Sequence, residues 1–86
     1  MRIPDLEARV TQILTARLGM PAEEVTPDAR LVDDLGMDSL DAVELAIATE
    51  RQFGVSISDE QVAKLVTVGD IMSLVDQLAD GERRPA

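Results

Sequence analysis

The sequence contains no histidine and no cysteine, and Phe53 is its single aromatic residue. Without cysteine there is no disulfide framework of the kind that stabilises small secreted domains. Without histidine, a Ser-His-Asp catalytic triad is excluded, and the usual zinc ligands are missing. The core must therefore be aliphatic, and any thiol chemistry must come from a group that the chain binds or carries.

The charge is one-sided, with 17 acidic against 8 basic residues and a net charge of −9. Nucleic acid is disfavoured as a partner because its phosphates would repel the chain. The acidity either serves solubility alone or steers the chain towards basic protein surfaces. The first residues do not resemble a signal peptide, and no apolar run approaches the ~20 residues that span a bilayer. We therefore expect a cytoplasmic location without membrane insertion.

A chain of 86 residues forms one domain with one small core. Helical spacing of apolar residues predicts an all-α fold, a small four-helix bundle with three longer helices and a short third one. The first helix is expected over 4–18, with Gly19 as a left-handed C-cap and Pro21 preventing its continuation. The second is expected over 39–53, with Asp38 as N-cap and Gly54 at its end.

Two further start signals follow. Residues 58–61, Ser-Asp-Glu-Gln, form a capping box that opens the short third helix, expected to end near Leu65. Residues 67–70, Thr-Val-Gly-Asp, open the fourth helix. We expect the domain to cover 1–80 and residues 81–86 to form a disordered tail. The long connection over 20–37 should be held to the core by Val25, Leu31, Val32 and Leu35.

The second helix carries two apolar stripes, although one stripe suffices to join a core. One comprises Ala42, Leu45, Ala46, Thr49 and Phe53, and the other, roughly opposite, comprises Leu40, Val43 and Ile47. The second stripe is explained by core packing, by an internal cavity, or by a partner. The remaining sector is an acidic ridge that begins at Asp38 and contains Asp41, Glu44, Ala48 and Gln52.

Ser39 opens this helix, and its surroundings exclude the usual catalytic arrangements. A nucleophile elbow needs glycine at the positions of Met37 and Asp41. Residues 33–44 fail as an EF-hand loop because its ligand positions and its glycine fall on Leu35, Met37 and Asp38. We expect neither an enzyme nor a metal site. Ser39 then either shares the capping of the helix or serves as a solvent-facing attachment point for a group added by another enzyme.

Residues 35–40, Leu-Gly-Met-Asp-Ser-Leu, resemble the attachment motif of acyl carrier proteins. The likeness continues in Asp-Ala-Val-Glu-Leu at 41–45, Phe-Gly-Val at 53–55 and Thr-Val-Gly-Asp at 67–70. The resemblance implies that Ser39 carries 4′-phosphopantetheine through a phosphodiester, loaded from coenzyme A by a phosphopantetheinyl transferase. It also implies that Asp38 helps to hold magnesium during this transfer. The arm supplies the thiol that the chain lacks.

The resemblance further implies partners with basic patches, among them the transferase and ketosynthase-type and other acyl-processing enzymes. Asp38, Asp41 and Glu44 would meet these patches, and Leu40 and Ile47 match apolar partner-contact positions. The bundle of such carriers can shelter an acyl chain, with the second helix lining the pocket. The chain would be a non-catalytic carrier, and we expect a monomer.

The pathway stays open between fatty-acid and polyketide or other specialised synthesis. Arg51 stands where fatty-acid carriers are usually acidic, and Gly-Met-Asp-Ser differs from the motif of peptidyl carriers. Two functions of other classes also stay open. One is an acidic helical adaptor that binds a basic protein without a covalent cofactor, and the other is a module that binds divalent ions.

Overall fold

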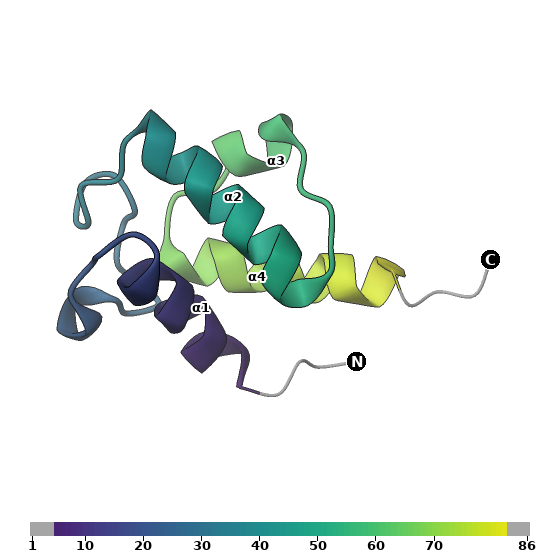
Figure 1. The fold of residues 1–86 in the computed structure, drawn as a ribbon, viewed down its shortest axis with the longest axis horizontal. Helices are drawn as coiled ribbons and strands as arrows, with labels where there is room; N and C mark the ends of the chain where they lie inside the picture. The colour runs from purple at the N-terminus through teal and green to yellow at the C-terminus, as the bar shows by residue number, and fades with distance from the viewer. Residues whose placement is uncertain (1–4, 83–86) are drawn as a thin grey trace.

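The computed structural model describes residues 5–82, which form a helical bundle without strands (Figure 1). The elements in chain order are α1 (Leu6–Ala16), the 3₁₀ helix η1 (Ala22–Glu24), α2 (Ser39–Phe53), α3 (Asp59–Ala63) and α4 (Val68–Glu82). The predicted all-α fold, with a short third α-helix, is confirmed. Of the helices in residues 5–82, none combines the length and the apolar character needed to cross a membrane.

Several helix ends differ from the prediction. The first helix ends at Ala16 rather than Leu18, because the chain turns at Gly19, which has φ of +70° as expected of a left-handed C-cap. The predicted starting residue, Pro4, lies outside the described residues. The third helix ends at Ala63, two residues before the predicted Leu65. The fourth continues to Glu82, so the first two residues of the predicted 81–86 tail are helical, and residues 83–86 lie outside the described range.

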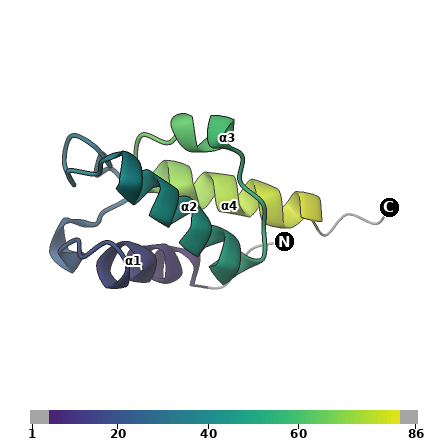
Figure 2. The same ribbon diagram turned by 45° about the horizontal axis from the view of Figure 1, so that its top comes forward.

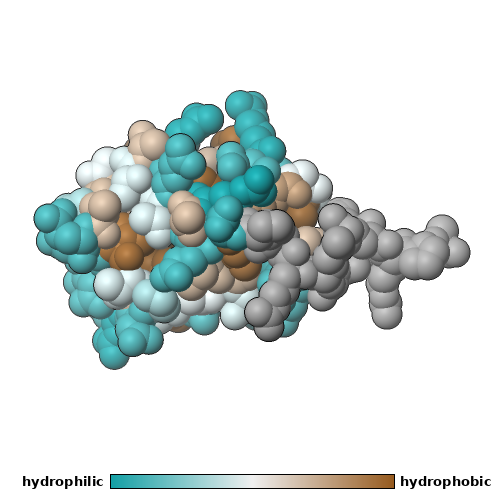
Figure 3. Space-filling model, turned by 90° about the horizontal axis from the view of Figure 1, so that it is seen from below, coloured by the Kyte–Doolittle hydropathy of each residue, from teal (hydrophilic) through white to brown (hydrophobic). Residues whose placement is uncertain are grey.

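Helices α1, α2 and α4 contact one another and enclose the core. Figure 2 shows α2 between α1 and α3, with α4 behind it. The fully buried residues are aliphatic, as the composition requires, apart from one threonine: Leu14, Leu31, Leu45, Ile71, Val10, Val68, Val75 and Thr49. Seen from below, polar side chains cover much of the surface and apolar ones show between them (Figure 3). On its outer side α2 is open to solvent, since Leu40 and Val43 are exposed there.

The connection before α2 is held down at several points. Leu31 and Val25 are buried and Leu35 is half-buried, as predicted, whereas Val32 is 62% exposed, so its predicted anchoring role is wrong. The reason is a tertiary contact: the Leu31 N–H donates to the Val66 carbonyl at 2.8 Å, which holds Leu31 inward and leaves the next residue of the turn outward. Met37, which was not predicted as an anchor, is buried.

Candidate functional site

Ser39 is the first residue of α2 and is exposed to solvent. Asp38 is the N-cap, as predicted, and its Oδ1 accepts a hydrogen bond from the Asp41 N–H at 2.8 Å. In turn, Asp41 Oδ2 accepts a hydrogen bond from the Asp38 N–H at 3.3 Å, which completes a capping box. Among the described residues no hydrogen bond reaches the Ser39 hydroxyl, so the capping role falls to Asp38 and the hydroxyl is available for modification.

The sequence reading missed this second half of the capping box. Asp41 was assigned to the acidic ridge and to partner contacts but not to capping, although an acidic residue three positions after an N-cap is a recognised signal. It also missed Met37, which precedes the N-cap and is 8% exposed. An apolar residue at this position commonly pairs with the residue four positions into the helix, here Ala42; Met37 belongs to the core cluster and Ala42 packs against it. Ser39 therefore follows the buried Met37 and the N-cap Asp38, and it lies in a first turn that two hydrogen bonds cap.

The segment leading to Ser39 is tied to the link between α3 and α4. The Val68 N–H donates to the Ala29 carbonyl at 3.0 Å, and the Met37 N–H donates to the Leu31 carbonyl at 2.9 Å. Gly36 has φ of +70°, a conformation that favours glycine over other residues. These contacts fix the backbone before Asp38, and the capping box fixes the turn after it, so the position of Ser39 is set by the fold.

The second apolar stripe of α2 is not part of the core. Leu40 is 79% exposed, Val43 57% and Ile47 40%, so the core-packing explanation is wrong. Leu45 and Thr49 of the first stripe are buried as expected, and Ala48, which was placed in the polar sector, is buried too. Apolar side chains exposed in a row along one helix are typical of a surface that meets a partner or a ligand.

Val43 and Ile47 border a groove between α2 and α3 with a volume of about 330 Å³. Its lining is mostly apolar and consists of Ala42, Val43, Ala46, Ile47, Glu50, Ile57, Asp59, Val62 and Ala63. Glu50 holds the wall in place, because its Oε2 accepts a hydrogen bond from the Ile57 N–H at 2.6 Å. Leu40 stands apart from the groove, close to Ser39. The stripe therefore offers an exposed apolar contact at Leu40, and Val43 and Ile47 form one edge of the groove.

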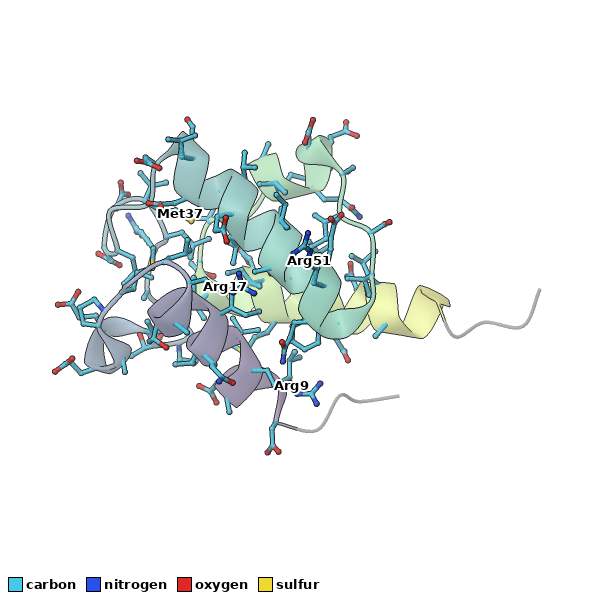
Figure 4. The ribbon with its side chains drawn as sticks, viewed as in Figure 1. Arg9, Arg17, Met37 and Arg51 are labelled. Atoms are coloured by element: carbon cyan, nitrogen blue, oxygen red, sulfur yellow. The ribbon has the colours of Figure 1, made fainter. Side chains whose placement is uncertain are left out.

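The three predicted acidic residues share the start of α2 but differ in their surroundings. Asp38 and Asp41 are engaged with backbone N–H groups. Glu44 lies 3.8 Å from Arg17, measured between Oε2 and Nη1, across the seam between α1 and α2. Figure 4 shows Arg17 at this seam. Such exposed pairs are worth about 0–1 kcal/mol, so Glu44 remains accessible to a competing cation.

The described residues contain no group of three or more acidic, histidine or cysteine side chains arranged to hold a metal ion. Ser39 is exposed at the start of a helix with a fixed first turn, where another molecule can reach its hydroxyl. Space around the hydroxyl fits an attached arm, since Leu40 beside it is also exposed.

The chain matches the family model described as "Phosphopantetheine attachment site" over residues 8–75. It belongs to this family, which confirms the resemblance to acyl carrier proteins. Its cofactor is covalently attached 4′-phosphopantetheine. Domains of the family are carriers and typically non-catalytic.

Proposed function

We propose that the protein is a discrete acyl carrier that holds acyl intermediates as thioesters on a 4′-phosphopantetheine arm attached to Ser39. The observation that carries the proposal is the exposed hydroxyl of Ser39 at the first residue of α2, in a turn fixed by the Asp38–Asp41 capping box. A serine that is presented to solvent but held at its backbone suits a covalent handle. The arm supplies the thiol that forms the thioester.

Loading would proceed on a phosphopantetheinyl transferase. The Ser39 oxygen bonds to the phosphorus that carries pantetheine, the pyrophosphate bond of coenzyme A breaks, and the adenosine bisphosphate leaves. A base of the transferase would take the hydroxyl proton. Asp38 would contribute a magnesium ligand. Its capping bond uses Oδ1, and a carboxylate has further acceptor positions to offer.

The acidic start of α2 supports docking on basic partner surfaces. Asp38, Asp41 and Glu44 would steer the carrier towards the transferase and towards ketosynthase-type and other acyl-processing enzymes. Leu40 and Ile47 would then fill apolar contacts at the centre of the interface. We place this work in the cytoplasm, in fatty-acid or polyketide biosynthesis, with the carrier as a monomer.

The groove between α2 and α3 supports the sheltering of part of the cargo. Its apolar lining and volume of about 330 Å³ suit a short stretch of an acyl chain. Burial of methylene groups there would stabilise the loaded carrier, since each buried methylene contributes about 0.8 kcal/mol.

Intact mass spectrometry after incubation with coenzyme A, magnesium and a broad-specificity phosphopantetheinyl transferase tests the proposal. We expect a gain of one phosphopantetheine on the wild type and none on Ser39→Ala, with both chains equally helical by circular dichroism. A gain on Ser39→Ala would contradict the assignment of Ser39. No gain on the folded wild type, with the transferase active on a control carrier, would favour the acidic adaptor.

A further inference from the structure

Basic side chains gather on one side of this acidic protein, along the seam between α1 and α2. A depression of about 240 Å³ lies there, which we call the arginine depression; it is lined by Arg9, Gln12, Ile13, Ala16, Arg17 and Gln52. Figure 4 shows Arg9 and Arg17 projecting from the α1 segment and Arg51 from the adjoining part of α2. All three arginines are exposed. Two guanidinium groups and two carboxamides give this hollow many hydrogen-bond donors.

The contacts of the two arginines show how the depression runs along the seam. Arg17 lies beside Glu44 in the first half of α2, at 3.8 Å. Arg9 lies over the ring of Phe53 at the end of α2, with its guanidinium carbon 5.9 Å from the ring centre. The two helices are therefore antiparallel along the seam, and the separation of eight positions between the arginines corresponds to about 12 Å along a helix. Contact with the Phe53 ring also restricts Arg9, which lowers the entropy cost of binding.

The outer side of α2 is therefore negatively charged at its N-terminal end and positively charged near its C-terminal end. Asp38 and Asp41 stand beside Ser39, whereas Arg51 lies near the other end of the helix, next to Gln52, the residue that α2 contributes to the arginine depression. Leu40, Val43 and Ile47 are exposed between them. A partner that offered only positive charge would meet like charge at the far end, which is unfavourable.

We propose that the arginine depression receives an acidic side chain from the protein that docks on α2, as a second contact that fixes the orientation of the carrier. This inference rests on the proposed carrier function. A carboxylate matches the planar fork of an arginine and the donors of the glutamines. The partner surface then carries a basic patch for the Ser39 end and a carboxylate for the far end. The net charge of −9 disfavours a polyanion such as nucleic acid as the occupant.

Two synthetic helical peptides provide the probe. The first has lysines in its first turn, leucines along one face and glutamates in its last turn, and the second has glutamines in place of the glutamates. Amide chemical shifts of the isotope-labelled full chain, without its arm, measure binding at low salt. We expect the glutamate peptide to bind about two- to fivefold more tightly, as for one or two exposed charge pairs. Its shifts should include Gln12 and Gln52.

Variants locate the effect. The double substitution Arg9→Gln and Arg17→Gln should abolish the preference for the glutamate peptide. Arg30→Gln should retain it, and Arg30 is a matched control because it is exposed and pairs with Asp33 at 3.5 Å. Thermal unfolding checks that each variant is folded. If the double variant does not fold, the single variant Arg17→Gln takes its place.

Three results would overturn the inference. One is equal binding of the two peptides by the wild type, and the second is a preference that survives in the arginine variants. The third is a short DNA duplex that shifts the same amides more strongly than the glutamate peptide, because the depression would then recognise phosphate. None of these depends on whether Ser39 accepts the arm, so failure here is distinct from failure of the carrier proposal.

Discussion

The N–H of Gly69 donates a hydrogen bond to the carbonyl oxygen of Pro27 at 2.9 Å, which joins the first turn of α4 to the connection that precedes Ser39. The approach is close, since a Cβ atom on Gly69 would stand 3.1 Å from that oxygen. Glycine at this position therefore serves backbone proximity rather than a positive φ. The fixed position of Ser39 depends in part on a residue thirty positions further along the chain.

Gly69→Ala should destabilise the protein. The added methyl group pushes the Pro27 carbonyl away, and overpacking of this kind costs about 1–3 kcal/mol, against a gain of up to about 1 kcal/mol in helix propensity. We expect a net loss of about 1 kcal/mol in the free energy of unfolding, measured by urea denaturation. Ser73→Ala, at an exposed position of the same helix, is the control and should be stabilising or neutral. A higher free energy of unfolding in Gly69→Ala would show that the Pro27 carbonyl moves aside without a net loss of stability.

Asp38 should have two separable roles. Asp38→Ala removes the cap of α2 and should cost about 1 kcal/mol of stability. Asp38→Asn keeps a capping oxygen but loses the charge, so it should restore stability while leaving phosphopantetheine loading slow. Urea denaturation and a time course of intact mass measure the two effects. Full loading activity in Asp38→Asn would rule out a role for the charge in transfer.

Much of the fold is predictable because its signals are local. The capping box at Ser58 and Gln61 was predicted from four residues, and it is confirmed by hydrogen bonds of 3.1 Å from the Gln61 N–H to Ser58 Oγ and 2.9 Å from the Ser58 N–H to Gln61 Oε1. The left-handed Gly54 at the end of α2 follows from the same kind of rule. Such interactions involve residues within a turn of one another, so the sequence alone is sufficient to predict them.

The path of the connection before α2 was less predictable. Val32 and Met37 are both apolar, yet the first is 62% exposed and the second 8%. The difference depends on the bond from Leu31 to Val66, which joins residues far apart in the sequence. The same limit applies to the site. The sequence placed Ser39 at the start of a helix, but the ion pair between Arg17 and Glu44 depends on how α1 packs on α2.

Asp70 should make the stability of the protein depend on pH. Backbone hydrogen bonds from the N–H groups of Thr67 and Val66, at 3.0 and 2.9 Å, hold the pKa of its carboxyl below the ordinary value of 3.8. Because the folded pKa is the lower one, this stabilisation is fully present above the unfolded pKa and is lost as pH falls through the folded pKa. We expect the difference in stability between wild type and Asp70→Asn to shrink as the pH falls below about 4.

Urea denaturation at a series of pH values from about 6 to 3 measures this difference. Asp76→Asn, on the same helix, provides the reference slope for loss of one carboxylate. A constant difference between wild type and Asp70→Asn across the series would show that the two backbone bonds do not discriminate between the charged and neutral carboxyl.

Glu44 should contribute to the rate at which basic partners associate. Glu44→Arg places a cation beside Arg17 on the docking side of α2, so the association rate with the transferase should fall severalfold at low salt and approach the wild-type rate at high salt. Stopped-flow fluorescence with a labelled carrier measures the rate. Glu60→Arg makes the same charge change on the exposed side of α3 and should have a smaller effect. Equal effects of the two substitutions on the association rate would show that Glu44 acts only through the net charge of the protein.

Occupation of the groove between α2 and α3 should depend on Ala46, which lines it. A carrier loaded with an octanoyl group should be more stable than one loaded with acetyl, by roughly 1–2 kcal/mol, if several methylenes are partly buried. Ala46→Phe fills the groove and should abolish this difference, whereas Leu40→Phe should keep it because Leu40 lies outside the groove. Thermal unfolding of each loaded form measures the effect. Equal stability of the octanoyl and acetyl forms of the wild type would mean that the cargo stays in solvent, and the groove would then belong to the docking surface.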